Sequence, residues 1–457
     1  MKTGNAIQSL LFTLLALLTL AACSQPPTQE DSGNSSKLDA YLTSLSDNQK
    51  MMSAVYVSQN GKPLYEHYSG FASVESNAPL TANTKFRIGS ITKTFTSVLI
   101  MQLIEDGKLS LNTPLDSFYP EIPNAESITI KQLLNHRSGI ASFTDQTAYV
   151  NYMTTAQSRE QMEQRIQSYA SVFEPNSQHQ YSNSNYVLLG FIIESLYEKS
   201  YGDVVSEKIS TPLNFESTYF GNSIEIEDNE ASSYRYSGDW QLQPATDMSV
   251  PHAAGAMVST AKDANAFIAS LFAGNLVSEG SLEQMITLED GYGLGLFAMP
   301  FYDRTLYGHN GGIDGFVSNV AVNPEDGIAI TVLSNGVNFA FNDVLIAVLS
   351  HLYDRDIEVL DFSSQPIDVS MSTLEQLTGA FSSDDLPLDI TISIKNKQLM
   401  AMATGQSELP LTAYSATEFR FEPAGIVIEF DAESLTNGKI DQFTLDQAGG
   451  KYRYTRE

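Results

Sequence analysis

A serine and a lysine stand three residues apart in FRIGSITKTF, residues 86–95, at the start of an apolar run. On a helix, positions i and i+3 are neighbours, so Ser90 Oγ and Lys93 Nζ can meet. A lysine in apolar surroundings has a lowered pKa and can remove the proton of a serine nucleophile. The alternative interpretation is structural, with Ser90 capping the helix and Lys93 reaching solvent. This motif alone leaves both interpretations open.

The same spacing recurs at residues 259–262, Ser-Thr-Ala-Lys, so one of the two matches is accidental. Two later stretches carry polar groups that could join the first serine. Tyr-Ser-Asn at residues 181–183 stands where a polar stretch leads into an apolar helix, and His-Asn-Gly at residues 309–311 stands in a glycine-rich strand edge. A second Tyr-x-Asn at residues 149–151 lacks that context, and a Lys-Thr-Gly at residues 2–4 lies in the N-terminal leader.

The order Ser-x-x-Lys, Tyr-x-Asn and His-x-Gly resembles that of the serine β-lactamase and penicillin-binding-protein superfamily. The resemblance covers about residues 38–355. Four stretches look like the branch that holds class C β-lactamases, D-alanyl-D-alanine carboxypeptidases, D-aminopeptidases and related esterases: PLTANTKFRIGSITKTFTSVLIMQLIEDGKLSLNTPL, ITIKQLLNHRSGI, YSNSNYVLLGFIIE and AAGAMVSTAKDANAFI. The last of these makes the second Ser-x-x-Lys a structural helix start.

The resemblance implies a catalytic role for three residues. Ser90 would be the nucleophile, Lys93 the base that activates it, and Tyr181 a second proton carrier that serves the leaving group and later the water. His136, in LLNHRSG, would be a structural histidine outside the site. Taken singly, a tyrosine such as Tyr181 is more often a core residue. Taken together, with order and flanking sequences matching, the motifs favour the catalytic interpretation.

The resemblance also implies a substrate-binding set. Asn183 would hold the substrate amide or its equivalent, and the strand edge with Gly311 would face it. The backbone N–H groups of Ser90 and Gly312 would form the oxyanion hole. His309 would present a hydrogen-bond donor to the substrate or the tyrosine, with a positive charge below a pKa of about 6.5.

His309 departs from the β-lactamase pattern, which has lysine at this position. A neutral imidazole binds a substrate carboxylate poorly, so strong β-lactamase activity is in doubt and the peptidase or esterase branch is favoured. We predict that any preference for carboxylate-bearing substrates rises as the pH falls toward 6, when His309 gains its charge.

The periodicity of apolar residues predicts the elements that carry these side chains. Two strand-like runs surround a turn within residues 52–72, a helix follows Ser90, and residues 130–270 are mostly helical. Strand character returns in residues 291–335, and residues 341–354 form a helix. This order predicts an α/β (α+β), β-lactamase/transpeptidase-like domain, in which an antiparallel sheet from both ends of the domain is flanked by helices and a helical subdomain.

The predicted division of the chain continues past this domain. The hydrolase domain spans residues 38–360, a linker follows at 361–371, and short alternating strands at 372–457 predict a small all-β, lipocalin-like barrel.

The sequence predicts an export signal before the hydrolase domain. Residues 1–22 resemble a lipoprotein signal peptide that ends in Leu-Ala-Ala before Cys23, and residues 23–37 would be a flexible tether. Cys23 is the chain's only cysteine. The sequence therefore predicts a lipid on Cys23 and a membrane anchor, on the periplasmic face and in the outer membrane if the cell has one.

Charge and composition narrow the partners. The 457-residue chain has a formal net charge of −29, which makes it a poor ligand for nucleic acid. No His or Asp cluster has convincing metal-ligand spacing, so neither a metal nor another cofactor is expected.

The sequence as a whole predicts an exported serine hydrolase that acts through an acyl-enzyme on a D-alanyl peptide, a D-amino-acid amide or a carboxylic ester. The alternatives are a weakly catalytic protein that binds cell-wall peptide, or a true class C β-lactamase.

Overall fold

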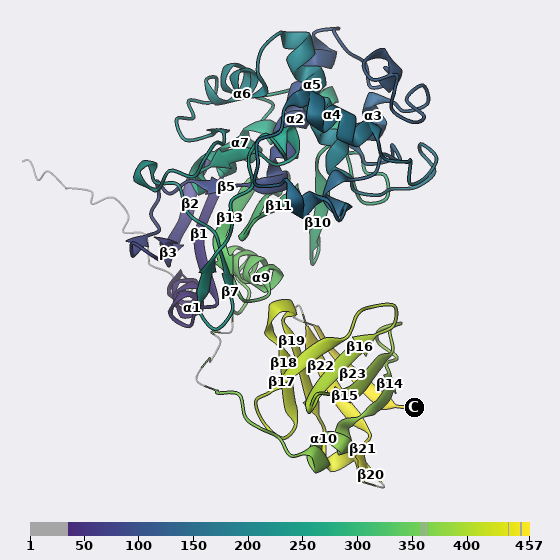
Figure 1. Cartoon of the computed structure of the whole chain (residues 1–457). Helices are drawn as coiled ribbons and strands as arrows, with labels where there is room; N and C mark the ends of the chain where they lie inside the picture. Colours follow the sequence, from purple (N-terminus) through teal and green to yellow (C-terminus); the bar gives the residue numbers. More distant parts are fainter. Residues whose placement is uncertain (1–34, 358, 360–361, 363, 437, 448–449) are drawn as a thin grey trace, which may run out of the picture.

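The computed structural model describes residues 35–357, 359, 362, 364–436, 438–447 and 450–457. It consists of a large domain of a sheet with helices on both faces and a smaller C-terminal β-barrel (Figure 1). The prediction of an antiparallel sheet flanked by helices, followed by a small all-β barrel, is confirmed. No helix in the described part of the chain is long and apolar enough to cross a membrane.

The main sheet joins the two ends of the large domain. Its strands lie in the order β10-β11-β12-β13-β1-β2, all antiparallel along this path, with bounds Phe297–Phe301, Arg304–Ile313, Phe316–Val322, Ile328–Val337, Met51–Gln59 and Lys62–Ser69. Two short strands extend it: β7 (Tyr234–Tyr236) pairs in parallel with β13, and β8 (Trp240–Leu242) pairs with β7. The pairing of β1 with β13 is what unites the sequence ends.

The first hairpin forms where the sequence predicts it. Asn60 and Gly61 both have positive φ, 50° and 75°, between β1 and β2. Two central residues of positive φ define the tight turn whose twist matches that of paired strands. β1 lies between β13 and the edge strand β2, and it is buried up to Ser58.

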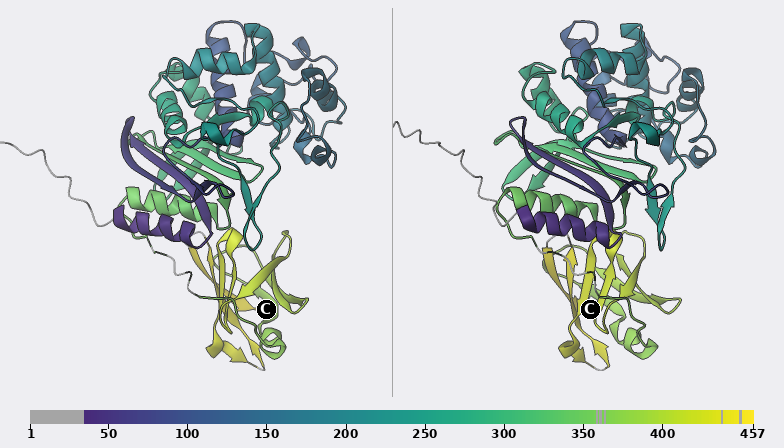
Figure 2. Two further views of the ribbon diagram at one scale, coloured as in Figure 1. Left: turned by 60° about the vertical axis from the view of Figure 1, so that its left-hand side comes forward. Right: turned by 90° about the vertical axis from the view of Figure 1, so that its left-hand side faces the viewer.

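Helices cover both faces of this sheet (Figure 2). On one face, α1 (Ser35–Asp47) and α9 (Phe341–Leu352) lie side by side and bury apolar residues against β1 and β13. On the other face, α7 (Ala261–Phe272) packs on the sheet next to α2 (Thr92–Glu105) and α5 (Asn183–Tyr197). The candidate site residues lie on this second face.

The region at residues 130–270 contains the predicted helices and several short strands that the periodicity did not indicate. The helices are α3 (Ile130–Leu134), α4 (Arg159–Gln167), α5, α6 (Tyr201–Val205) and the start of α7; residues Glu279–Ile286 form α8. Two of these strands, β6 (Tyr219–Phe220) and β9 (Met257–Ser259), form a small separate sheet with β5 (Phe86–Arg87) from earlier in the chain, in the order β5-β9-β6. Strands of two or three residues are too short to give an alternating pattern, which is why they were missed.

The C-terminal unit is a closed antiparallel barrel. Its strands are β14 (Gly379–Ser382), β15 (Ile390–Lys395), β16 (Gln398–Ala403), β17 (Leu409–Ala413), β18 (Glu418–Phe421), β19 (Ile426–Phe430), β22 (Gln442–Gln447) and β23 (Gly450–Arg456). It begins with a helix, α10 (Met371–Leu377), where the sequence suggested only strands. Aromatic side chains fill its interior: Phe381, Phe419, Phe430, Phe443 and Tyr454. The barrel therefore has a packed core, as small barrels do.

Candidate active site

Ser90 lies on a tight turn that feeds into a buried helix. The turn is the 3-10 segment Gly89–Ile91, and α2 begins at the next residue. No side chain caps either helical start, so Ser90 Oγ is not engaged as a cap. Gly89 has φ 51°, and a Cβ there would come within 2.8 Å of Gly312 N. The turn is therefore pressed directly against strand β11, and only glycine fits between them.

Lys93 lies one turn into α2 and is completely buried. Its Nζ lies 3.0 Å from Ser90 Oγ, 2.7 Å from Asn183 Oδ1 and 2.7 Å from the carbonyl oxygen of Ala254. Burial holds the pKa of Lys93 well below its ordinary value. A neutral amine has two N–H donors and one lone pair. The amide and carbonyl oxygens accept the two N–H bonds, which leaves the lone pair for the Ser90 hydroxyl.

Asn183 is the first residue of α5, and both the oxygen and the nitrogen of its side-chain amide are hydrogen-bonded. Its Oδ1 accepts from Lys93, and its Nδ2 donates to Thr144 Oγ1 at 2.9 Å. Its backbone N–H donates to Ser142 Oγ at 3.1 Å. The sequence assigns Asn183 to the substrate, and the structure shows that its carbonyl oxygen is already used to orient the lysine.

Tyr181 completes the polar group around the serine. Burial raises the pKa of Tyr181, and a hydrogen bond with Ser90 opposes this in part. Lys93 Nζ lies 4.8 Å from the centre of the Tyr181 ring. A phenol with a raised pKa keeps its proton at neutral pH, so Tyr181 is available as a proton donor.

Strand β11 brings Gly311 and Gly312 to the serine. Pairing with β10 ends at Gly308, so residues 309–313 have no β10 partner on that edge. A Cβ on Gly311 would come within 2.0 Å of the Ile88 carbonyl oxygen. Ser318 of the neighbouring strand donates to the same oxygen at 2.9 Å. These contacts fix the β11 edge beside the turn that carries Ser90, whereas Gly312 has open space where a side chain would be.

His309 lies in this strand but does not behave as the sequence suggests. It is buried, and its Nδ1–H donates to the carbonyl oxygen of Asn310, so its Nε2 accepts from Tyr292 Oη at 2.8 Å. Burial and the nearby Lys93 lower the pKa of His309 to about 3. The prediction that His309 gains a positive charge near pH 6 is therefore wrong. Its ring nitrogens are both used inside the protein.

The second Ser-x-x-Lys has no comparable surroundings. Ser259 Oγ lies 2.8 Å from Thr218 Oγ1 and donates to the Thr260 carbonyl oxygen at 3.1 Å. Thr260 caps helix α7 through Asp263 N, and Lys262 is exposed. The interpretation of this motif as a structural helix start agrees with the geometry. The other Tyr-x-Asn, residues 149–151, forms a separate 3-10 turn.

Two aromatic residues beside the site were missed or set aside by sequence reasoning. Tyr292, in GYGLGLF, is buried and hydrogen-bonded to His309, and no motif pointed to it. The ring of His136 lies 4.2 Å from that of Tyr181, and its Nδ1 accepts from Ser182 N at 3.1 Å. His136 thus supports the tyrosine from behind, in line with a structural role. The sequence feature that could have indicated Tyr292 is its position between two glycines just before a strand.

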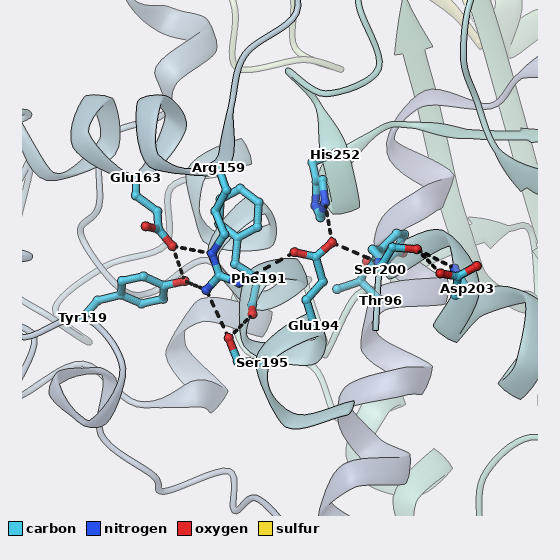
Figure 3. A network of polar contacts seen from close by, with 11 residues as sticks. Thr96, Tyr119, Arg159, Glu163, Phe191, Glu194, Ser195, Ser200, Asp203 and His252 are labelled. Atoms are coloured by element: carbon cyan, nitrogen blue, oxygen red, sulfur yellow. Dashed lines mark hydrogen bonds and ion pairs between the residues drawn. The ribbon is translucent and has the colours of Figure 1, made fainter. Parts of the chain in front are cut away.

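A polar network beside α2 includes Arg159, Glu194 and His252 (Figure 3). The turn His252–Ala254 presents Ala254 O to Lys93 and Ala253 O to Thr96 Oγ1, the latter at 2.7 Å. His252 Nε2 lies 3.2 Å from Glu194 Oε1, which belongs to α5, and Arg159 lies 3.8 Å from the same carboxylate. Helices α4 and α5 are therefore linked to the turn whose Ala254 carbonyl oxygen contacts Lys93.

The chain matches the family model described as Beta-lactamase over residues 38–353. This chain belongs to the β-lactamase family of serine hydrolases. It is 25% identical to penicillin-binding protein 4* of Bacillus subtilis (strain 168) over 92% of this chain and 98% of the relative. It is 27% identical to a teichoic acid D-alanine hydrolase of Staphylococcus aureus, over 68% of this chain and 77% of the relative. Among solved structures, it resembles the D-amino acid amidase of Ochrobactrum anthropi SV3 with L-phenylalanine amide, at TM-score 0.63 and 25% identity over 71% of this chain and 99% of that one.

The family assignment confirms the resemblance drawn from the three motifs, and the enzyme class is a serine hydrolase. The relatives include both a D-alanine hydrolase and an amidase, so the family alone leaves the substrate open. Cys23 and the predicted signal peptide lie outside the described residues.

Proposed function

We propose that this protein hydrolyses small esters or amides of D-amino acids through an acyl-enzyme on Ser90. The observation that carries the proposal is the arrangement of Lys93, whose Nζ meets Ser90 Oγ at 3.0 Å while two oxygens 2.7 Å away occupy its N–H groups. This geometry directs the lone pair of a neutral lysine at the serine hydroxyl. General-base assistance of this kind requires hydrogen-bond contact, which Lys93 makes with Ser90, and it is favoured by the lowered pKa that burial gives Lys93.

The reaction follows from these positions. Lys93 takes the proton from Ser90 Oγ as the oxygen attacks the substrate carbonyl carbon. The resulting oxyanion is bound by the backbone N–H groups of Ser90 and Gly312. Collapse of the tetrahedral intermediate breaks the bond to the alcohol or amine, which leaves with a proton from Tyr181, and Tyr181 recovers a proton from Lys93. Water then attacks the acyl group by the same route and releases the acid and free Ser90.

The charges around the site favour substrates without a free carboxylate. With a pKa of about 3, His309 is neutral, and it is bonded to Tyr292. Burial lowers the pKa of Lys93, and its Nζ is bonded to Asn183 and to the Ala254 carbonyl oxygen. Arg87, three residues before the serine, is paired with Asp314 at 3.2 Å. None of these three groups offers an unpaired positive charge to a substrate anion. A substrate carboxylate would meet neutral donors only, and such hydrogen bonds are about half as strong as charge-assisted ones.

The net negative charge of the whole chain favours a substrate whose acyl group carries a free ammonium. The net charge of −29 attracts cations toward the protein surface. Esters and amides of amino acids carry an ammonium on the acyl side and no carboxylate. The names of two relatives point to this chemistry, one as a teichoic acid D-alanine hydrolase and the other as a D-amino acid amidase. D-Alanyl esters and D-amino-acid amides are therefore the substrate class we propose.

We also propose that the enzyme is exported and anchored by a lipid on Cys23. The support is the sequence alone, an apolar leader that ends in Leu-Ala-Ala directly before the chain's only cysteine. Export would bring the site to D-amino-acid esters and peptides of the cell envelope. Cys23→Ala is expected to move the protein from the membrane fraction to the soluble fraction. Recovery of wild-type protein with an unmodified N-terminus at another position would contradict the anchor.

The test is a panel of matched substrates. We expect kcat/KM for D-alanyl-D-alanine amide to exceed that for D-alanyl-D-alanine, which differs by a free carboxylate, by about tenfold. Acetylation of the amino group should reduce kcat/KM, and the L-alanyl isomer should be the poorer substrate. D-Alanine methyl ester tests ester cleavage. Ser90→Ala is the control for contaminating hydrolases.

Two results would contradict the proposal. Preferred hydrolysis of D-alanyl-D-alanine or of a penicillin would indicate a carboxypeptidase or a β-lactamase. An acyl-enzyme that forms on Ser90, seen by intact mass, but is not hydrolysed with any member of the panel would indicate a peptide-binding protein.

A further inference from the structure

A buried ion pair joins the two chain segments that meet at Ser90. Arg87 Nη1 lies 3.2 Å from Asp314 Oδ2, and the two side chains are 3% and 0% exposed. Arg87 also donates to the carbonyl oxygens of Thr246, at 2.7 Å, and Asn222, at 2.9 Å. The other carboxylate oxygen of Asp314 accepts from Thr246 Oγ1 at 2.6 Å. Both guanidinium Nη atoms and both carboxylate oxygens are thus hydrogen-bonded within the protein, while Arg87 Nε is buried without a partner.

The two partners flank the backbone groups proposed for the oxyanion hole. Arg87 is on β5, three residues before Ser90. Asp314 is in the turn between β11 and β12, two residues after Gly312. At the other end of the same two segments, the Gly89 and Gly312 backbones are in contact, since a Cβ on Gly89 would lie 2.8 Å from Gly312 N. The two segments are therefore joined at both ends, by the ion pair and by the glycine contact, and the backbone N–H groups of Ser90 and Gly312 belong to these segments.

The turn itself is held in an unusual backbone conformation. Asp314 has φ 55°, and the following Gly315 donates its N–H to Ser233 Oγ at 3.1 Å. A Cβ at Gly315 would meet the Tyr234 carbonyl oxygen at 2.6 Å, so this turn is also pressed against β7. Because the turn is fixed on two sides, movement of Asp314 would be transmitted along β11 to Gly312.

Stability does not explain such a pair. Burying two charges costs several kcal/mol of desolvation, and replacing a buried pair with apolar residues is often neutral or stabilising. Substrate binding does not explain it either, because Arg87 is inaccessible and already bonded to Asp314 and two carbonyl groups. What the pair does fix is the separation between the turn that carries Ser90 and the edge of β11 that carries Gly312.

We propose that Arg87 and Asp314 are positioning residues that set the distance between the Ser90 and Gly312 N–H groups. This inference rests on the proposed function, because it assigns those two groups to the oxyanion. A misplacement of about 1 Å costs on the order of a hundredfold in rate, and loss of one oxyanion donor costs about 10²–10³-fold in kcat. The pair would therefore affect the transition state rather than the proton transfer between Ser90 and Lys93.

The test is the rate at which a fluorophosphonate labels Ser90, since the phosphoryl oxygen of that adduct enters the oxyanion hole whatever the natural substrate is. The double variant Arg87→Met/Asp314→Asn removes both charges together and leaves neither one buried alone. We expect labelling to slow by about 10–100-fold, in line with a displaced donor. The midpoint of the pH–rate profile, which reports Lys93, should not move.

The control is a second Arg–Asp pair on the same sheet. Arg304 Nη1 lies 3.2 Å from Asp326 Oδ2 at the opposite end of β11. Arg304→Met/Asp326→Asn should leave the labelling rate unchanged. If the Arg87 double variant does not fold, the labelling rate of Arg87→Lys tests the proposal instead. This variant keeps the positive charge but loses the planar guanidinium, so it should be labelled more slowly than the wild type.

The outcomes separate the two proposals. Wild-type protein that is not labelled at Ser90 overturns the proposed function, and this inference falls with it. Normal labelling of the wild type together with an unchanged rate in the folded double variant, or in Arg87→Lys where that variant decides, overturns only the positioning role. A slower rate with a shifted pH midpoint also overturns it, since the pair would then act through Lys93.

Discussion

The same four-residue pattern occurs twice in this chain with opposite results. At Ser90 the lysine is fully buried and its Nζ contacts the serine at 3.0 Å, whereas at Ser259 the lysine, Lys262, is exposed. Ser90 lies on a 3-10 turn before its helix, and Ser259 lies at the end of strand β9, with Thr260 as the helix cap. Spacing is therefore not sufficient for the pairing of serine and lysine.

The difference arises from what packs against each helix start. At α2, helix α5 and the turn at His252–Ala254 enclose the lysine and supply the oxygens that accept its N–H groups. At α7, Lys262 points to water, and Thr218 binds the serine hydroxyl. Desolvation lowers a lysine pKa, and burial has this effect on the enclosed Lys93.

The largest expected effect is at the two serines. Ser90→Ala should reduce kcat by at least about a thousandfold and leave the fold intact, as expected for loss of a nucleophile. Ser259→Ala should leave kcat unchanged and lower the free energy of unfolding by about 1–2 kcal/mol, because it removes buried hydrogen bonds. Kinetics on the best substrate of the panel and thermal unfolding measure both. Inactivation by Ser259→Ala in a folded protein would reverse the assignment.

The two lysines give the next contrast. Lys93→Met should lower kcat by about 10²–10⁴-fold, the usual contribution of a general base, and Lys262→Met should have no effect. The two variants keep similar volume at the substituted position. Equal effects of the two substitutions would contradict a special role of Lys93 in proton transfer.

The lysines also differ in their effect on stability. The pKa of Lys93 is lowered by burial, so between its folded pKa and its unfolded value near 10.5 only the unfolded state is protonated. The free energy of unfolding therefore decreases as the pH falls from about 10.5 toward the pKa of Lys93 in the folded protein. The Tm of the wild type relative to Lys93→Met should rise between neutral pH and pH 10. Lys262→Met provides the baseline, and a difference that does not change with pH would contradict the neutral lysine.

His309 gives a smaller effect that separates the sequence-based prediction from the structure. With a pKa of about 3, His309 stays neutral from pH 6 to 8. The ratio of kcat/KM for D-alanyl-D-alanine to that for its amide should therefore change by less than about twofold over this range, since His309 gains no charge there. A ratio that rises toward pH 6 in the wild type and is flat in His309→Asn would restore the original prediction.

The same histidine affects acid stability. Between pH 6.5, the ordinary value, and about 3, the unfolded state binds a proton that folded His309 does not. Stability is thus lost as the pH falls through this window, and His309→Asn should lose less of it than the wild type. Urea unfolding at pH 7 and pH 4.5 measures this difference.

The smallest expected effect is at the helix cap beside the accidental motif. Thr260 Oγ1 accepts from Asp263 N at 3.1 Å. Thr260→Ala should cost about 1 kcal/mol of stability, the usual effect of losing an N-cap, with no change in kcat. Activity that falls along with stability would show that the start of α7 communicates with the site.

Sequence alone determined the family, the order of the elements and the identity of the candidate residues. Glycines at the turns, apolar periodicity after Ser90 and the three motifs are local features, and a local pattern is readable without contacts. Thus the Asn60-Gly61 hairpin and the strands after residue 297 stand where the pattern predicts them. The helix α10 and the strands of two or three residues were missed because they are too short to show a period.

Tertiary structure decided what each polar group does. Burial lowers the pKa of Lys93 and of His309, and the packing of α5 against α2 brings Asn183 Oδ1 to the lysine. These neighbours come from residues about 90 to 160 positions away along the chain, such as Asn183 and Ala254. A pKa depends on desolvation and on nearby charges, both of which exist only after distant segments pack together. The sequence could therefore name the serine and the lysine, but only the fold distinguished the buried copy from the exposed one.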